Sequence, residues 1–339
     1  MSTAEAIRIS EKVALSPVDR LHGLIEDDMT ATDRAIHERL GSAVSLIPDL
    51  AKHLVDSGGK RLRPMLTIAA AKLCGYGGAA HVKLAAAVEF IHTATLLHDD
   101  VVDGSALRRG KIAANIVWGN KPSILVGDFL FSRAFQLMVE TGNMAVLDIL
   151  AGASAIIAEG EVLQLRSANN LATTEDDYLR VITAKTATLF SASAESGALL
   201  AGAPRDQVAG LRAYGHNLGI AFQLIDDTLD YSGRAAQMGK SVGDDFREAK
   251  MTLPVILAFA RADQEAQRFW TRTIENGVQH ESDLMRAVGY VENTGAIEDT
   301  RAMAHRYVDA ACSALAVFPK GEMRDCLIDV AESSVGRSA

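Results

Sequence analysis

The chain has 339 residues, of which 48% are hydrophobic, and its 34 Lys and Arg against 43 Asp and Glu give a net charge of -9. Such a chain can bury a large core, while the acidic excess gives no electrostatic reason to expect a nucleic acid partner. Its three cysteines lack disulfide or metal-site spacing, and no signal-like or membrane-spanning apolar run occurs, so we expect a cytoplasmic protein.

Most of the sequence follows the pattern of α-helices. Apolar residues recur at three- and four-residue spacing on an Ala- and Leu-rich background, and alternating β-branched runs are almost absent. No repeat or flexible linker divides the chain, so we predict one all-α domain over residues 1–339, a large helical bundle around a central cavity, with about the first 20 residues loosely ordered. Breaks between helices are expected at 74–78, 103–111, 119–123, 166–176, 201–206 and 232–245.

The segment 96–103, LLHDDVVD, places three aspartates at the end of an apolar helical run. On a helix, Asp99, Asp100 and Asp103 gather on one side at ~5–6 Å spacing, where each unscreened pair costs about 3 kcal/mol. A hard divalent cation such as Mg²⁺ would relieve this repulsion. For this motif alone, a solvated acidic helix end is the simpler interpretation.

The segment 223–231, QLIDDTLDY, repeats the Asp-Asp-x-x-Asp spacing on a second helix-patterned background. Gln223, Asp227 and Asp230 follow an i, i+4, i+7 stripe, so this helix presents one polar face while its apolar residues pack elsewhere. Two coincidental copies are improbable. If the two helices face each other, Asp226, Asp227 and Asp230 would complete a carboxylate cage for several Mg²⁺ ions with the first motif.

Basic residues flank both aspartate motifs. They are Lys60, Arg61 and Arg63 in GGKRLRP, Arg108, Arg109 and Lys111 after the first motif, Lys185 in a helix that Thr173 or Thr174 can cap, and Lys240 and Lys250 after the second motif. Each cluster alone would usually be a solvated patch. Together they suit a diphosphate, which bridges Mg²⁺ ions and needs cationic partners.

Two histidines lie near the first motif. His92 precedes Asp99 by seven residues, so it shares the helical stripe of the aspartates and should face the cage, although a lone helix histidine is more often structural. His98 adjoins Asp99 and resembles the His-Asp pair of a metal phosphohydrolase. That alternative needs further histidine ligands and leaves the second aspartate motif unexplained.

The motifs GGKRLRP, LLHDDVVD with LRRG, TAKTA, QLIDDTLDY and GKSVGDDFREAKMTLP, in this order over about residues 50–260, resemble those of trans-isoprenyl (polyprenyl) diphosphate synthases. The resemblance implies the all-α isoprenoid synthase fold, usually as a homodimer. It also implies a prenyltransferase that condenses isopentenyl diphosphate head-to-tail onto an allylic diphosphate such as geranyl or farnesyl diphosphate. The chain departs from the family pattern at Ala249, where glycine is common, and Arg337 is the only base in its C-terminal tail.

The resemblance further implies a role for each motif residue. Two or three Mg²⁺ ions and the allylic diphosphate would be bound by Asp99, Asp100, Asp103, Asp226, Asp227 and Asp230. The allylic side would be assisted by Arg108, Lys185, Thr186, Gln223 and Lys240. Isopentenyl diphosphate would be held by Lys60, Arg63, His92 and Arg109. Lys250 matches a family position only in residue type.

Ala94 and Thr95 lie one turn before the first aspartates, where short-chain relatives tend to carry bulky aromatic residues. Small side chains there would leave room for a lengthening apolar tail, although small residues also allow close helix packing. We therefore expect a long product, octaprenyl to decaprenyl, like that of the quinone side-chain synthases. A transient membrane contact during product release is left open.

Two further alternatives use the same motifs. A class I terpene cyclase or a head-to-head condensing enzyme would share the metal chemistry, but the isopentenyl site formed by GGKRLRP and His92 argues against it. A silent subunit of a heteromeric synthase would be non-enzymatic, and it has no need to keep both aspartate motifs complete.

Overall fold

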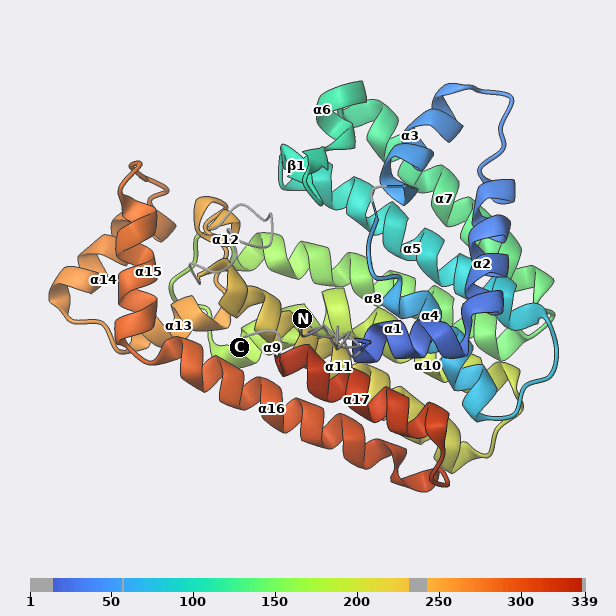
Figure 1. The fold of residues 1–339 in the computed structure, drawn as a ribbon. Helices are drawn as coiled ribbons and strands as arrows, with labels where there is room; N and C mark the ends of the chain where they lie inside the picture. Colours follow the sequence, from blue (N-terminus) through green and yellow to red (C-terminus); the bar gives the residue numbers. More distant parts are fainter. Residues whose placement is uncertain (1–14, 57, 232–242, 337–339) are drawn as a thin grey trace, which may run out of the picture.

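The structure, a computed structural model, describes residues 15–56, 58–231 and 243–336, and most of these residues are helical (Figure 1). The elements are α1 (Pro17–Leu24), α2 (Glu26–Arg39), α3 (Leu46–Val55), α4 (Leu62–Leu73), α5 (Ala80–Val102), β1 (Leu107–Arg108), β2 (Lys111–Ile112), α6 (Ala114–Trp118), α7 (Asn120–Glu140), α8 (Met144–Ser167), α9 (Glu175–Ile182), η1 (Thr183–Ala187), α10 (Thr188–Leu200), α11 (Arg205–Asp230), α12 (Asp244–Arg247), α13 (Leu253–Ala260), α14 (Gln264–Trp270), η3 (Thr271–Glu275), α15 (Asp283–Asn293), α16 (Ala296–Ala314), η4 (Leu315–Val317) and α17 (Glu322–Gly336). The all-α prediction is confirmed.

The predicted helix boundaries hold in most places. Helix α1 begins at Pro17, inside the stretch expected to be loosely ordered, and Ser16 caps it by accepting from Asp19 N. The expected break at 119–123 is wrong beyond Gly119, because α7 begins at Asn120 and contains Pro122 in its first turn, where proline is tolerated. No helix in the described ranges is both long enough and apolar enough to cross a lipid bilayer.

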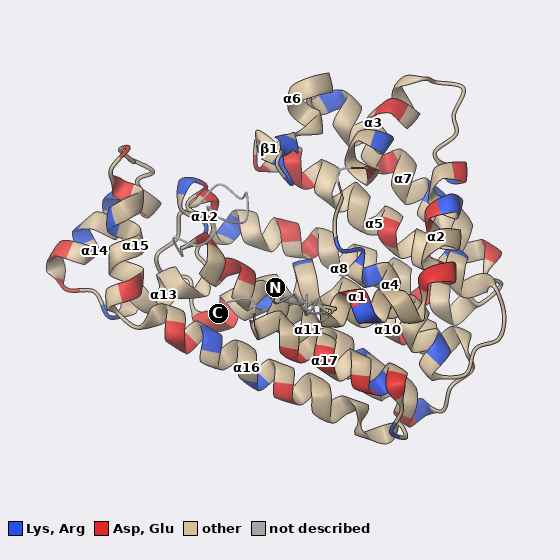
Figure 2. Ribbon diagram, viewed as in Figure 1, with Lys and Arg blue, Asp and Glu red and all other residues tan. Residues whose placement is uncertain are grey.

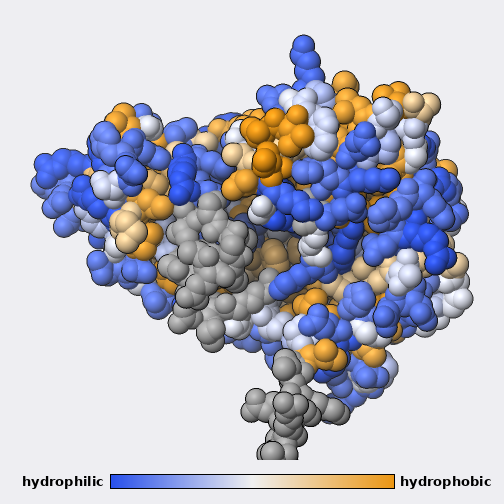
Figure 3. All heavy atoms as spheres, turned by 45° about the horizontal axis from the view of Figure 1, so that its top comes forward, coloured by the Kyte–Doolittle hydropathy of each residue, from blue (hydrophilic) through white to orange (hydrophobic). Residues whose placement is uncertain are grey.

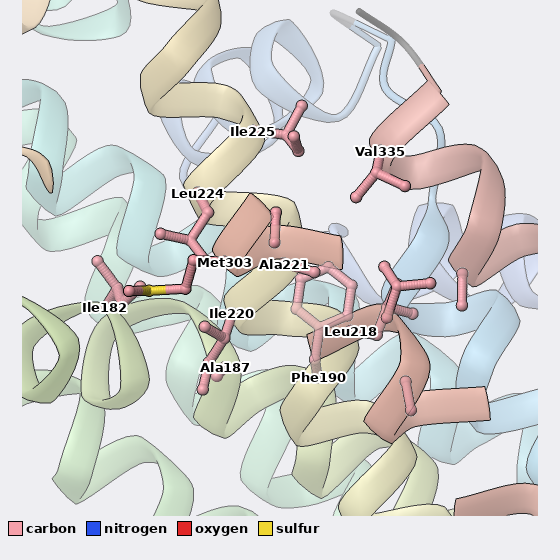
Figure 4. Packing of buried hydrophobic residues seen from close by; sticks show 14 of the residues in the cluster. Ile182, Ala187, Phe190, Leu218, Ile220, Ala221, Leu224, Ile225, Met303 and Val335 are labelled. Atoms are coloured by element: carbon pink, nitrogen blue, oxygen red, sulfur yellow. The ribbon is translucent and has the colours of Figure 1, made fainter. Parts of the chain in front are cut away.

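The core consists of two apolar clusters. One lies around α10, α11 and α16, and the other lies around α5, α7 and α8. Figure 4 shows the first cluster, in which Phe190 of α10 lies beside Leu218 and Ala221 of α11. These two clusters hold α5 and α11 in place, so they fix the positions of both aspartate motifs.

Helices α9 and α10 form one continuous rod that is interrupted by the π-helical turn η1. The Thr188 N–H bonds to the Thr183 carbonyl five residues earlier, and the Thr188 hydroxyl donates to the same oxygen at 2.9 Å. Such π-bulges occur frequently at functional sites. Thr174 caps the rod through a reciprocal box with Asp177, as expected for Thr173 or Thr174.

The expected break at 103–111 contains a β-hairpin. Strand β1 pairs antiparallel with β2, Arg108 opposite Lys111. The two connecting residues, Arg109 and Gly110, have φ of +52° and +76°, which is the pattern of a type I′ turn. Lys111 Nζ donates to the Asp56 carbonyl at 3.1 Å, so the hairpin is tied to the loop between α3 and α4.

Large apolar side chains remain exposed on one region of the molecule. Figure 3 shows apolar surface around the hairpin and α6, where Leu107, Ile112 and Ile116 are each more than half exposed. Further exposed apolar residues lie on α7 and α8, among them Leu125 at 66% and Val162 at 59%. Such patches often mark interaction surfaces.

Candidate active site

The two aspartate motifs lie at the C-terminal ends of α5 and α11. Asp99 and Asp100 are in the last turn of α5, and Asp103 is its C-cap, while Asp226, Asp227 and Asp230 occupy the end of α11. Figure 2 shows basic and acidic positions side by side where α5 meets β1. The negative end of a helix dipole makes such carboxylates costly without cationic partners.

Each aspartate of the first motif has its own basic neighbour. Arg108 donates from Nε to Asp100 Oδ1 at 2.7 Å, and Asp100 is fully buried. Lys250 Nζ lies 3.1 Å from Asp103 Oδ2, and Lys185 Nζ lies 3.8 Å from Asp99 Oδ2. Burial raises the pKa of Asp99 and of Asp100, while Lys185 and Arg108 oppose the rise at Asp99 and Arg108 opposes it at Asp100.

Lys185 has a second acidic neighbour, Glu161 of α8, that the sequence reasoning missed. Lys185 Nζ donates to Glu161 Oε2 at 2.8 Å. Burial, together with the nearby Asp99 carboxylate, raises the pKa of Glu161 to about 7, against the opposing effect of Lys185. A single glutamate in the middle of a helix gives no pattern that a sequence search could recognise.

In the second motif, Asp227 is held by two donors. It accepts from Tyr178 Oη at 2.6 Å and from Gln223 Nε2 at 2.7 Å, and Gln223 Oε1 accepts from Thr186 Oγ1 at 2.9 Å. Burial raises the pKa of Asp227 to about 7, although both hydrogen bonds favour its ionised form. The sequence reasoning also missed Tyr178, because this tyrosine lies on α9, nearly 50 residues before Asp227 in the chain.

Asp230 joins α11 to the short helix α12. Its carboxylate accepts backbone N–H groups of Gly243, Asp244 and Asp245, at 3.1, 3.2 and 2.9 Å. Burial and the neighbouring Asp227 and Asp230 raise the pKa of Asp245 well above its ordinary range. Asp245 therefore belongs to the same acidic group, although the sequence reasoning gave it no role.

A cavity of about 130 Å³ lies between α8, the α9–η1 rod and α11. Lys185, Thr186, Gln223, Asp227 and Lys250 line it, together with Gln164, Ser167, Ala168, Tyr178, Val181, Ile182, Asp245, Met251 and Thr252. The structure thus gathers residues from the TAKTA motif, the second aspartate motif and the segment after α12. Lys240 lies outside the described residues.

A second cluster, mostly basic, lies around the start of α4. Arg63 Nη1 donates to His92 Nε2 at 3.2 Å, and its guanidinium lies 4.4 Å from the centre of the Phe190 ring. Burial, then the charges of Arg63 and Arg109, lowers the pKa of His92 well below its ordinary value, so the imidazole is neutral and accepts this bond. Lys60 is exposed at the edge of the cluster.

The other two arginines of this cluster, Arg61 and Arg109, lie in strained backbone conformations. Arg61 and Arg109 have φ of +48° and +52°, a conformation that costs energy for a residue other than glycine. Arg61 Nη1 donates to Glu89 Oε1 at 2.8 Å, and Arg109 donates to the Gly58 carbonyl. Arg63 Nε is buried without a hydrogen-bond partner, so the cluster has a donor to offer an anion.

His98 contacts α7 and none of the motif aspartates, and its Nε2 lies 3.5 Å from Asp128 Oδ1 of that helix. Its Nε2 lies 3.1 Å from the Ile124 carbonyl, and its ring stacks on Phe131 of α7 at 6.0 Å. The geometry therefore gives no support to the His-Asp pair of a metal phosphohydrolase. Ala94 is fully buried in the α5–α7–α8 cluster, and the half-buried Thr95 donates to the His92 carbonyl at 2.8 Å.

The donor set fits a hard divalent cation. All six motif side chains are carboxylates, and Asp100 Oδ2 is buried without a hydrogen-bond partner. Within the described ranges, no three metal-ligating side chains already converge on one point. Mg²⁺ is commonly bound by one or two carboxylates together with water and substrate phosphate, so a dispersed set of this kind suits it.

Comparison with known proteins agrees with this site. The model of the polyprenyl synthetase family matches residues 44–291. Octaprenyl diphosphate synthase of Escherichia coli (strain K12) is 46% identical over 321 residues, which cover 94% of this chain and 99% of that protein.

Two solved structures are also similar to the chain. A polyprenyl synthase from Caulobacter crescentus CB15, complexed with calcium and isoprenyl diphosphate, has a TM-score of 0.93 at 53% identity and covers 95% of this chain and 98% of its own. A decaprenyl diphosphate synthase from Rhodobacter capsulatus has a TM-score of 0.91 at 57% identity, over 95% and 99%. The chain belongs to the polyprenyl synthetase family of prenyltransferases.

Proposed function

We propose that this protein condenses isopentenyl diphosphate units head-to-tail onto geranyl or farnesyl diphosphate in a Mg²⁺-dependent reaction. Proteins named for octaprenyl and decaprenyl products match nearly the whole length of the chain, so the chain is a long-chain all-trans polyprenyl diphosphate synthase. The observation that carries the proposed site is the η1 turn: Lys185 reaches Asp99 and Glu161, while the adjacent Thr186 reaches Gln223 and, through it, Asp227. One turn therefore connects both aspartate motifs.

The allylic diphosphate would bind between the two motifs. Asp99, Asp100, Asp103, Asp226, Asp227 and Asp230 would hold two or three Mg²⁺ ions with it. When bound, Mg²⁺ would neutralise the departing diphosphate and so favour cleavage of the allylic C–O bond. Lys185, Arg108 and Lys250 would add positive charge, with Thr186 and Gln223 as hydrogen-bonding partners and Lys240 as a further cation.

Isopentenyl diphosphate would bind at the second cluster, through Lys60, Arg63, Arg109 and His92. The bond-forming step joins its double bond to the allylic carbon, and the proton that is lost would pass to the released diphosphate. The buried surroundings would exclude water, which would otherwise capture the allylic cation. The presence of this second cluster favours chain elongation over a cyclase, which needs no second diphosphate.

The growing chain would extend past Ala94 and Thr95, and their small side chains would permit the octaprenyl to decaprenyl range. A homodimer is the proposed assembly, supported by the exposed apolar residues on α7 and α8. The product would be a hydrophobic chain of the kind used in quinone side chains, and a transient membrane contact would serve its release.

A single assay tests the activity. Purified protein is given farnesyl diphosphate, radiolabelled isopentenyl diphosphate and Mg²⁺, and the dephosphorylated products are separated by chain length. We expect a ladder that ends at a linear prenol of eight to ten isoprene units. This range is taken from the octaprenyl and decaprenyl diphosphate synthases to which the chain is similar. A cyclised product would contradict the proposal, and so would absence of incorporation by this protein alone.

A further inference from the structure

Glu161 is an acidic side chain that none of the motifs contains, and it contacts Lys185, one of the residues that line the cavity. Its Oε2 accepts from Lys185 Nζ at 2.8 Å, whereas Asp99 Oδ2 lies 3.8 Å from the same nitrogen. Both side chains are largely buried, with 20% of Lys185 and 23% of Glu161 exposed. A charge-assisted hydrogen bond in such a place is stronger than one at the surface.

The backbone brings these two residues together. Gly160 precedes Glu161, and a Cβ at position 160 would lie 2.8 Å from Ala184 Cβ and 3.0 Å from Lys185 N. A glycine at this position therefore lets α8 approach the η1 turn closely. This approach places the Glu161 carboxylate beside the Lys185 ammonium. Without such a partner, the four rotatable bonds of the lysine side chain would leave the ammonium mobile.

Glu161 and Asp99 compete for the same ammonium. Lys185 already forms the longer ion pair with Asp99, at 3.8 Å, and without Glu161 it would be free to close fully onto that carboxylate. Resting on the proposed function, we propose that Glu161 is a positioning residue: it holds Lys185 for the allylic diphosphate and limits its pairing with Asp99 to this longer contact. An Asp99 carboxylate that is only weakly paired in this way stays available to a divalent cation.

The test uses a double-mutant cycle on the full-length protein. The variants are Glu161→Ala, Glu161→Gln and Lys185→Ala, together with the pair Glu161→Ala/Lys185→Ala. Glu159→Ala is the matched control, because Glu159 is an exposed glutamate two positions earlier on α8. Equilibrium binding of a non-hydrolysable thio analogue of farnesyl diphosphate is measured with and without Mg²⁺, and KM is measured separately for each substrate.

We expect Glu161→Ala to weaken analogue binding and to raise the allylic KM by about tenfold, while the KM for isopentenyl diphosphate stays unchanged. In the Lys185→Ala background, the same change should have less than about a twofold effect, because the two residues act through each other. Glu161→Gln should stay within about threefold of the original protein, since the amide oxygen still accepts from Lys185. The control should not change.

An equal loss in both backgrounds would overturn the proposal, as would a loss in the KM for isopentenyl diphosphate alone. Thermal unfolding of each variant separates this role from a structural one. If the alanine variant does not fold, Glu161→Gln replaces it, and a loss of allylic binding well above threefold in both backgrounds overturns the proposal. Failure of the proposed function shows differently: the unmodified protein would then make no prenol. The binding comparison requires no turnover.

Discussion

Tyr178 Oη donates a 2.6 Å hydrogen bond to Asp227 Oδ2, so α9 holds a buried carboxylate that belongs to α11. Burial raises the pKa of Asp227 to about 7. This carboxyl is therefore protonated below that pH and ionised above it. Because a cation needs the ionised form, Mg²⁺ affinity should fall as the pH drops below about 7.

Tyr178→Phe removes a donor that favours the ionised form of Asp227. We expect the pH midpoint of Mg²⁺ binding to move upward, and the affinity at neutral pH to drop about tenfold, the effect of roughly 1.4 kcal/mol. Mg²⁺ titrations with the thio analogue at about pH 6 to 9 measure both quantities. If the pH midpoint does not move, this hydrogen bond does not control the pKa of the Asp227 carboxyl.

Arg63 should serve the other substrate. Its guanidinium is packed against Phe190 and His92, so Arg63→Lys keeps the charge but loses the planar donors. We expect KM for isopentenyl diphosphate to rise about tenfold or more, with the allylic KM unchanged. Steady-state kinetics with each substrate varied in turn checks this, and Arg268→Lys on α14 is the control. A rise confined to the allylic KM would contradict the assignment.

Ala94→Phe should shorten the product. The aromatic ring would enter the space proposed for the growing tail, and chain-length analysis of the products would show the ladder ending earlier. Because Ala94 is fully buried, the larger side chain should also lower stability by about 1–3 kcal/mol. Leu96→Phe, two positions along the same helix, controls for added bulk. Unchanged product length in a folded Ala94→Phe protein would refute this account of the pocket.

Exposed apolar residues on α7 and α8 should lie in the dimer contact. We expect Leu125→Glu combined with Val162→Glu to convert a dimer to a monomer, because both charges would be buried at an apolar interface. Light scattering after size-exclusion chromatography gives the mass of each form. Val278→Glu, at a position that is 47% exposed outside these helices, should leave the mass unchanged. A monomeric unmodified protein would contradict the dimer.

Asp283 should make stability depend on acid pH. Hydrogen bonds from Arg272 at 2.7 and 2.8 Å lower the pKa of Asp283 to about 2, below about 3.9 for an unfolded chain. The ion pair therefore stabilises the fold above about pH 4, and this contribution is lost as the pH falls toward 2. Asp283→Asn should cost about 1–2 kcal/mol at neutral pH by denaturant unfolding. A difference that persists unchanged at about pH 2.5 would exclude this cause.

The predictable parts of the site are those with a repeated spacing. The repeated spacing alone predicted the roles proposed for Asp99 and Asp227, because two chance copies of one pattern are improbable. The helical period predicted that His92 faces the aspartates, whereas the structure pairs it with Arg63 in the basic cluster. Residues that act through a single long-range contact leave no such pattern. Glu161 reaches Lys185 only because α8 lies against η1, and nothing in either local segment reports that contact.

Backbone features were equally hard to foresee. The hairpin has strands of only two residues each, too short for any alternation of polar and apolar positions, and its turn depends on an arginine at positive φ. The sequence of the α9–η1–α10 rod predicts an ordinary α-helix, because the residues of its π turn are also common in α-helices. The all-α fold, by contrast, follows from a pattern that extends over most of the chain.

The η1 turn also limits how this chain can change. A π turn holds one residue more than the α-helix it interrupts, so deletion of a residue other than Lys185 from 183–187 would rotate α9 by about 100° relative to α10. Tyr178 would then face away from Asp227 while Lys185 kept its place, or the reverse. A single substitution can alter one of these side chains alone, but a change of length at η1 would separate the two halves of the proposed diphosphate site in one step.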